Sequence, residues 1–235
     1  SSVRLARCTQ PTRSADLLRR PRLLEQLHEN IHRKLTLIAA AAGYGKTSLV
    51  VDFAQDTDYR VAWCRLDETD RDVTQLVSDV SLALRQCFPE YQSHLEQLAA
   101  QPGHGPEDLA RALINEFQEA LDDYFILVLD DFHLVESAPA VIRFFDGLLA
   151  DLPEQAHLLI VGRTIPALRI ASLAARQQMS GLSEDDLRFT PAEAAEFLNR
   201  VMGLNLSAED VAALEARTEG WIAGLQMAGL SMQGR

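Results

Sequence analysis

The nine residues Ala40–Ser48, AAAGYGKTS, constrain the fold of this chain more than any other feature. They follow the short apolar run Leu35–Ala39, which is typical of a buried strand. The segment after them has an apolar helical face made of Leu49, Val50 and Phe53. A strand, a glycine-rich loop and a helix in this order form a phosphate-binding loop, because loop amides and the helix dipole converge on an anion.

The loop residues have separate expected roles. Gly43 and Gly45 permit backbone torsions and a close approach that side chains would block. Lys46 is expected to reach the β- and γ-phosphates of a nucleotide, and the Thr47 hydroxyl to bind Mg²⁺. The pattern G-x-x-x-x-G-K-[ST] is met except at its first glycine, which is Ala40 here. The predicted nucleotide-binding residues are Ala40, Ala41, Ala42, Gly43, Tyr44, Gly45, Lys46, Thr47 and Ser48.

A second motif, FILVLDDFH at Phe125–His133, ends an apolar run with two aspartates. The run is typical of a central strand that is buried on both faces. Asp130 is expected to hold Mg²⁺ through water, and Asp131 to orient or deprotonate the water that attacks the γ-phosphate. The alternative is that two acids merely end a strand and begin a loop. The loop motif at Ala40–Ser48 favours the first interpretation.

Two other strand ends carry charged residues. Arg163 follows the apolar run Leu158–Val161 and is placed to sense the γ-phosphate and stabilise charge on it, the alternative being a surface arginine. Asp67, Glu68 and Asp70 follow the strand candidate Arg60–Leu66, where a solvated loop is favoured over a role at the site.

The alternation of strand and helix patterns predicts an α/β fold with a mainly parallel sheet covered on both faces. From about residue 165 the pattern becomes mostly helical, with helices expected near 190–203, 207–220 and 221–230. We therefore predict a P-loop nucleotide-binding domain over residues 1–168 and a small helical domain over residues 169–235.

Charge and cysteine content limit the classes of partner. The net charge of −12 disfavours a DNA-reading surface. The first 34 residues are locally basic, as either an anion-attracting patch or a solvated helix face. Three scattered cysteines, and no apolar run of about 20 residues, indicate a cytoplasmic protein without a membrane span. The sequence starts without methionine or a signal peptide, so we expect a trimmed chain or part of a longer one.

Seven segments together resemble the signal-transduction ATPases with numerous domains. Within these, the chain is similar to the large LuxR-type transcriptional regulators related to the maltose-regulon activator. The segments are RRPRLLEQL at 19–27, AAAGYGKTS, VAWCRLDETD at 61–70, FILVLDDFH, VGRT, DLRFTPAEAAEFLNRVMGL at 186–204 and TEGWIAGLQMAGL at 218–230.

The resemblance implies a parallel five-stranded sheet followed by a helical domain, and an ATP/ADP switch that self-associates when ATP and a small-molecule inducer are bound. It implies that the inducer binds elsewhere in the parent chain and that DNA is contacted only by a C-terminal helix-turn-helix absent from these residues. Arg22 matches a segment that wraps the base, so it enters as a nucleotide contact. Two positions depart from the family: Ala41 replaces a proline, and Gly162 replaces the serine before Arg163.

The leading hypothesis is a slowly hydrolysing, Mg²⁺-dependent ATPase switch in which Lys46, Asp131 and Arg163 are catalytic. A metabolic phosphotransferase or kinase is an alternative, but it would need a lid with arginines and an acceptor pocket, and the compact helical region disfavours it. A second alternative, an interaction domain that binds ADP without hydrolysis, stays open.

Overall fold

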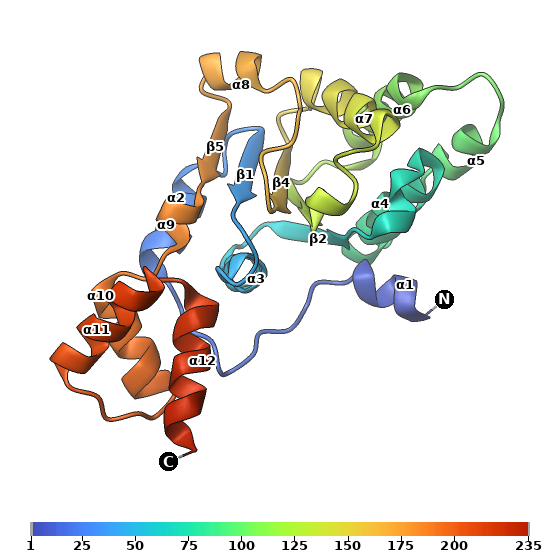
Figure 1. The fold of residues 1–235 in the computed structure, drawn as a ribbon. Coiled ribbons are helices and arrows are strands. Elements are labelled where there is room, and N and C mark those ends of the chain that lie inside the picture. Colours follow the sequence, from blue (N-terminus) through green and yellow to red (C-terminus); the bar gives the residue numbers. More distant parts are fainter. Residues whose placement is uncertain (1, 235) are drawn as a thin grey trace.

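The computed structural model describes residues 2–234, which contain one five-stranded sheet. All paired strands are parallel, in the order β2-β3-β4-β1-β5 (Figure 1). The strands are β1 (Leu35–Ala39), β2 (Arg60–Arg65), β3 (Phe125–Asp130), β4 (Ala156–Gly162) and β5 (Met179–Leu182). Every strand ends at the same edge of a parallel sheet, so the residues that follow the strands gather there.

Burial on both faces explains the apolar run of β3. Phe125, Leu127 and Leu129 pack into the core on one face of the sheet. Ile126 and Val128, which alternate with them, pack into the core on the other face. A strand between two helical layers therefore has no solvent-facing side, and each of its first five residues is fully buried.

The helices form two layers and a separate C-terminal group. Helices α4, α6 and α7 share the larger core with one face of the sheet, and α2 and α3 share the smaller core with the other face. The helices before β5 are α1 (Ser2–Arg7), α2 (Pro21–Glu29), α3 (Lys46–Asp56), η1 (Glu68–Arg71), α4 (Val73–Cys87), α5 (Leu95–Ala100), α6 (Pro106–Ala120), η2 (Phe132–Leu134), α7 (Pro139–Ala150) and α8 (Ala171–Ala175).

The C-terminal helices make a small unit with its own core (Figure 1). Its first helix starts at a capping box between Thr190 and Glu193, and Gly203 follows its last turn with φ +70°. Ser207 caps the next helix through the amide of Asp210. The helices after β5 are α9 (Glu184–Leu187), α10 (Pro191–Glu196), η3 (Phe197–Val201), α11 (Ala208–Thr218) and α12 (Ile222–Gln233).

The structure confirms the parallel five-stranded sheet and the helical C-terminal region. It also shows that the predicted boundary at residues 168/169 cuts through the sheet. Strand β5 comes after that boundary and pairs with β1 from Leu35–Met179 to Ile38–Leu182. The sheet therefore extends to Leu182, and the boundary belongs after it.

The basic N-terminal segment is neither of the two alternatives expected from its charge. From α1 it runs as an extended strap to α2, past the C-terminal helices (Figure 1). Its arginines pair with acids elsewhere in the chain, as in the ion pairs Arg7–Asp70, Arg13–Asp52, Arg19–Asp56 and Arg20–Glu193. These ion pairs hold the strap against the rest of the chain.

Within residues 2–234, no helix is both long and apolar enough to cross a bilayer.

Candidate nucleotide-binding site

The loop between β1 and α3 has the curled backbone that the sequence predicts. Gly43 and Gly45 adopt φ values of +87° and +71°, in the region that favours glycine, and Gly45 is the N-cap of α3. The Lys46 ammonium curls back over the loop and donates to the carbonyls of Ala40 and Ala41 at 2.6 and 2.9 Å. The loop thus carries a cation beside the helix N-terminus, where an anion is favoured.

Thr47 and Asp130 come together at the start of α3 and the end of β3. The Thr47 hydroxyl donates to Oδ2 of Asp130 at 3.0 Å. Burial first, and then the neighbouring Asp131, raises the pKa of Asp130 to about 6. A buried carboxylate beside a hydroxyl suits Mg²⁺, which uses one or two protein oxygens and takes the rest from phosphates and water.

Asp131, Arg163 and His133 complete the polar edge above the sheet. Asp131 has a left-handed backbone, with φ +58°, and its carboxylate accepts a hydrogen bond from Arg65 Nε at 2.9 Å. Arg163 is exposed after β4. Burial first, and then the positive charge of Arg163, lowers the pKa of both Lys46 and His133.

The C-terminal unit is hydrogen-bonded directly to the loop. Trp221 Nε1 donates to the Ala42 carbonyl at 3.1 Å, and the Ala223 amide donates to the Gly43 carbonyl at 3.0 Å. A Cβ added at Gly43 would lie 2.6 Å from the Ala223 Cβ. Gly43 is therefore needed for the contact with α12 as well as for its torsion.

A second segment touches the loop from the end of β5. The Ala41 amide donates to Oε2 of Glu184, the first residue of α9, at 3.2 Å. Tyr44 is buried, and this burial raises the pKa of its phenol. The loop is thus covered from both the sheet side and the helical side.

A small cavity of about 40 Å³ lies beside the loop, between the strap, α3 and the C-terminal helices. Ligand pockets usually have roughly 300–1,000 Å³, so this cavity is too small for a nucleotide base. Arg22 lies outside the cavity lining, and its guanidinium pairs with Glu193 at 2.8 Å. The lining is Leu17, Leu18, Arg20, Gly45, Ser48, Leu49, Asp52, Phe189, Phe197 and Ile222.

Comparison with known proteins places this geometry in a family. The family model for the AAA ATPase domain matches residues 16–161. The chain belongs to this family. Its sequence is also 32% identical to the HTH-type transcriptional regulator MalT of Yersinia pestis over 230 residues, and 31% identical to MalT of Serratia proteamaculans. Each match covers 96% of the chain, and the chain spans about a quarter of the length of these relatives.

Solved structures show the same fold at low identity. A signal-transduction ATPase with numerous domains and a tetratricopeptide repeat sensor, from Pyrococcus horikoshii, has a TM-score of 0.61 at 15% identity. That match covers 91% of this chain and 30% of the other. A Walker-type ATPase of Pyrococcus abyssi has a TM-score of 0.58 at 15% identity, covering 96% of this chain and 70% of that one. The resemblance predicted from seven sequence segments is confirmed.

Sequence reasoning missed the contacts that reach the loop from far along the chain. The sequence alone assigns no role at the loop to Trp221, Glu184 or Arg65. The tryptophan and glutamate meet the loop 179 and 143 residues away from their partners. No local sequence pattern predicts such pairs. The one signal is that Trp221 immediately precedes a helix, where its indole N–H can donate to another segment.

Proposed function

We propose that this AAA ATPase domain is an ATP-binding, slowly hydrolysing switch in a signal-responsive transcriptional regulator. The observation that carries the proposal is the double use of one loop. Residues Gly43–Thr47 form the curled backbone that carries Lys46 and the Thr47 hydroxyl. The carbonyls of Ala42 and Gly43 in the same loop accept hydrogen bonds from Trp221 and Ala223 of the helical unit. A triphosphate that rearranges this loop would change how the helical unit sits on it.

The residue roles follow from position. Lys46 would turn from its own loop carbonyls to the β- and γ-phosphates, and Thr47 with Asp130 would hold Mg²⁺, which neutralises phosphate charge. Asp131 would orient or accept a proton from the attacking water, and Arg163 would stabilise charge on the γ-phosphate. DNA contact would belong to a helix-turn-helix elsewhere in a longer chain, as the words HTH-type transcriptional regulator in the name of the MalT relatives suggest. The inducer would also bind elsewhere in that chain, and the switch itself would self-associate.

Single-turnover hydrolysis of ATP, with Asp131→Asn as control, tests the proposal. We expect binding by both proteins, with hydrolysis slowed strongly, to a residual rate, only in the variant. Binding without hydrolysis in the unmodified protein would support the ADP-binding interaction domain instead. Transfer of phosphate to a small acceptor rather than water would support the phosphotransferase alternative.

A further inference from the structure

Arg65 lies beside the acidic pair at the edge of the sheet. It is the last residue of β2, and its partner in the register with β3 is Asp130. Its Nε donates to Oδ2 of Asp131 at 2.9 Å. Within residues 2–234 no other hydrogen bond reaches the Asp131 carboxylate, so one oxygen is held and Oδ1 is left to accept from a water.

The backbone alone does not fix the direction of this carboxylate. Asp131 is held in a left-handed conformation, with φ +58° and ψ +36°, but its side chain can still rotate about χ1. Lys46 is close enough for its charge to interact with Asp131. Pairing with Arg65, the last residue of β2, holds the carboxylate toward that strand.

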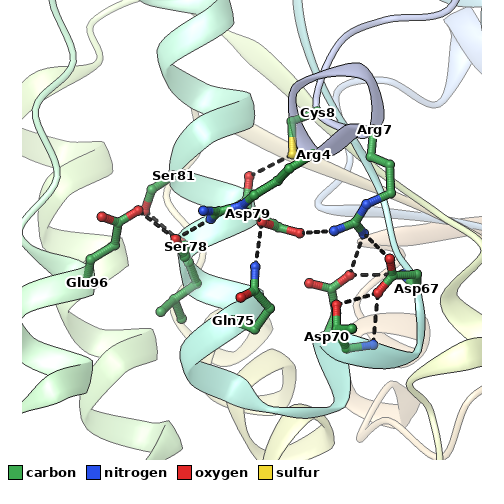
Figure 2. A network of polar contacts seen from close by, with 12 residues as sticks. Arg4, Arg7, Cys8, Asp67, Asp70, Gln75, Ser78, Asp79, Ser81 and Glu96 are labelled. Carbon is green, nitrogen blue, oxygen red and sulfur yellow. Dashed lines mark hydrogen bonds and ion pairs between the residues drawn. The ribbon is translucent and has the colours of Figure 1, made fainter. Parts of the chain in front are cut away.

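Arg65 is itself held from behind by the N-terminal helix. Arg7 Nη1 donates to the Arg65 carbonyl at 3.0 Å. The Arg7 guanidinium lies between Asp67, Asp70 and Asp79, two of which, Asp70 and Asp79, are completely buried (Figure 2). This network fixes the main chain from which the Arg65 side chain extends.

We propose that Arg65 is a positioning residue for ATP hydrolysis, which holds one oxygen of Asp131 so that the other faces the attacking water. The inference rests on the proposed function, in which Asp131 acts on that water. A group that orients a reacting residue affects the rate of the chemical step more than the binding of substrate, because binding depends on contacts that stay in place.

The test is steady-state and single-turnover ATP hydrolysis by the whole chain and by Arg65→Gln, Arg65→Lys, Asp131→Asn and the double variant Arg65→Gln/Asp131→Asn. We expect Arg65→Gln to lower kcat by roughly 10- to 100-fold with KM changed by less than about threefold. Arg65→Lys, which keeps a cation in reach, should recover part of the loss. In the Asp131→Asn background the arginine change should cost less than about twofold, because its target is gone.

Arg60→Gln is the matched control, since Arg60 is at the opposite end of β2 and its side chain is similarly exposed. Thermal unfolding of each variant shows whether it folds. If Arg65→Gln does not fold, the comparison is made with Arg65→Lys instead. Equal losses in the presence and absence of the Asp131 carboxylate would overturn the inference, as would an unchanged kcat. No hydrolysis by the unmodified protein would instead show that the proposed function fails, and this inference with it.

Discussion

Lys46 and Asp130 are both held where their charged forms are disfavoured. Burial lowers the pKa of Lys46, and Arg163 adds to this effect. Burial raises the pKa of Asp130 to about 6 although its carboxylate accepts from Thr47, because Asp131 adds a second negative charge. A phosphate chain beside the lysine and a cation beside the aspartate would favour both charged forms. Both shifts therefore support the proposal that an anion and a metal bind here together.

Replacing Lys46 tests the loop as a phosphate site. We expect Lys46→Ala to weaken ATP binding by several kcal/mol, of which roughly 1.5–3 comes from each lost hydrogen bond to a charged group. Isothermal calorimetry measures the affinity. Lys34→Ala is the control, because Lys34 is the one other lysine of the sequence. It lies just before β1, at the end of that strand opposite to the loop. Equal ATP affinities for Lys46→Ala and the parent protein would contradict the assignment.

Substitutions at Gly43 and Gly103 can distinguish the cost of a clash with α12 from the cost of backbone strain. In Gly43→Ala the new methyl group would meet Ala223 Cβ at 2.6 Å and Trp221 Nε1 at 2.7 Å. Gly103→Ala has similar strain, with φ +95°, but nothing within 4 Å. We expect both variants to lose about 1 kcal/mol from positive φ, and Gly43→Ala to lose a further 1–3 kcal/mol. Urea unfolding measures this, and matching losses would show that α12 yields freely.

At the scale of elements, most of the sheet and the helical faces follow from periodicity, because each is a repeated choice between a buried and a solvated side. The sequence predicts the uniformly apolar β3, the helical stretch formed by α10 and η3, and the capped helix α11 near their observed bounds. Strand β5, MSGL, was not, since its four residues have neither alternation nor an apolar run. Its place comes from pairing with β1, which is a tertiary contact. The strap could not be predicted from the sequence either, because its ion pairs join residues that are distant in the chain.

The ion pair between Arg20 of the strap and Glu193 of the helical unit should lose its stabilising effect in acid. Burial opposes ionisation of Glu193, but hydrogen bonds from Arg20 and the Thr190 amide lower its pKa from 4.5 to about 2. A pKa lowered on folding stabilises the protein above pH 4.5, and that contribution is lost as the pH falls through about 2. The shift corresponds to about 3 kcal/mol.

Glu193→Gln should therefore lower the free energy of unfolding by roughly 2–3 kcal/mol at pH 7. The difference from the parent protein should shrink steadily as the pH is lowered from 5 toward 2, as followed by denaturant unfolding at each pH. A difference that stays constant over this range would mean that the carboxylate charge contributes nothing. Glu196→Gln, an exposed glutamate on the same helix, is the control.

At the scale of the whole molecule, two units with separate cores meet at the nucleotide loop. The larger unit contains the sheet, and the smaller one reaches the loop through Trp221 and Ala223. The cavity of about 40 Å³ between them is enclosed by the strap, α3 and the C-terminal helices. Entry of a base should therefore change the distance between the units.

Tryptophan fluorescence should report that movement. The chain has two tryptophans, and Trp63 lies in the sheet with 1% of its surface exposed. In a Trp63→Phe background the emission comes from Trp221 alone. We expect saturating ATP to shift or quench this emission, and Lys46→Ala to abolish the change. Unaltered emission under conditions where calorimetry shows full binding would mean that the units do not move.

The position of β5, after residue 168 in the chain, has a practical consequence for the design of truncated proteins. A fragment cut at residue 168 would contain every motif of the phosphate loop, yet it would expose one whole side of β1, whose amides and carbonyls pair with β5 in the intact sheet. An unpaired, apolar border of this kind recruits further strands from neighbouring copies. Truncations meant to isolate the ATPase should therefore run beyond Leu182, or they will yield precipitate rather than a smaller enzyme.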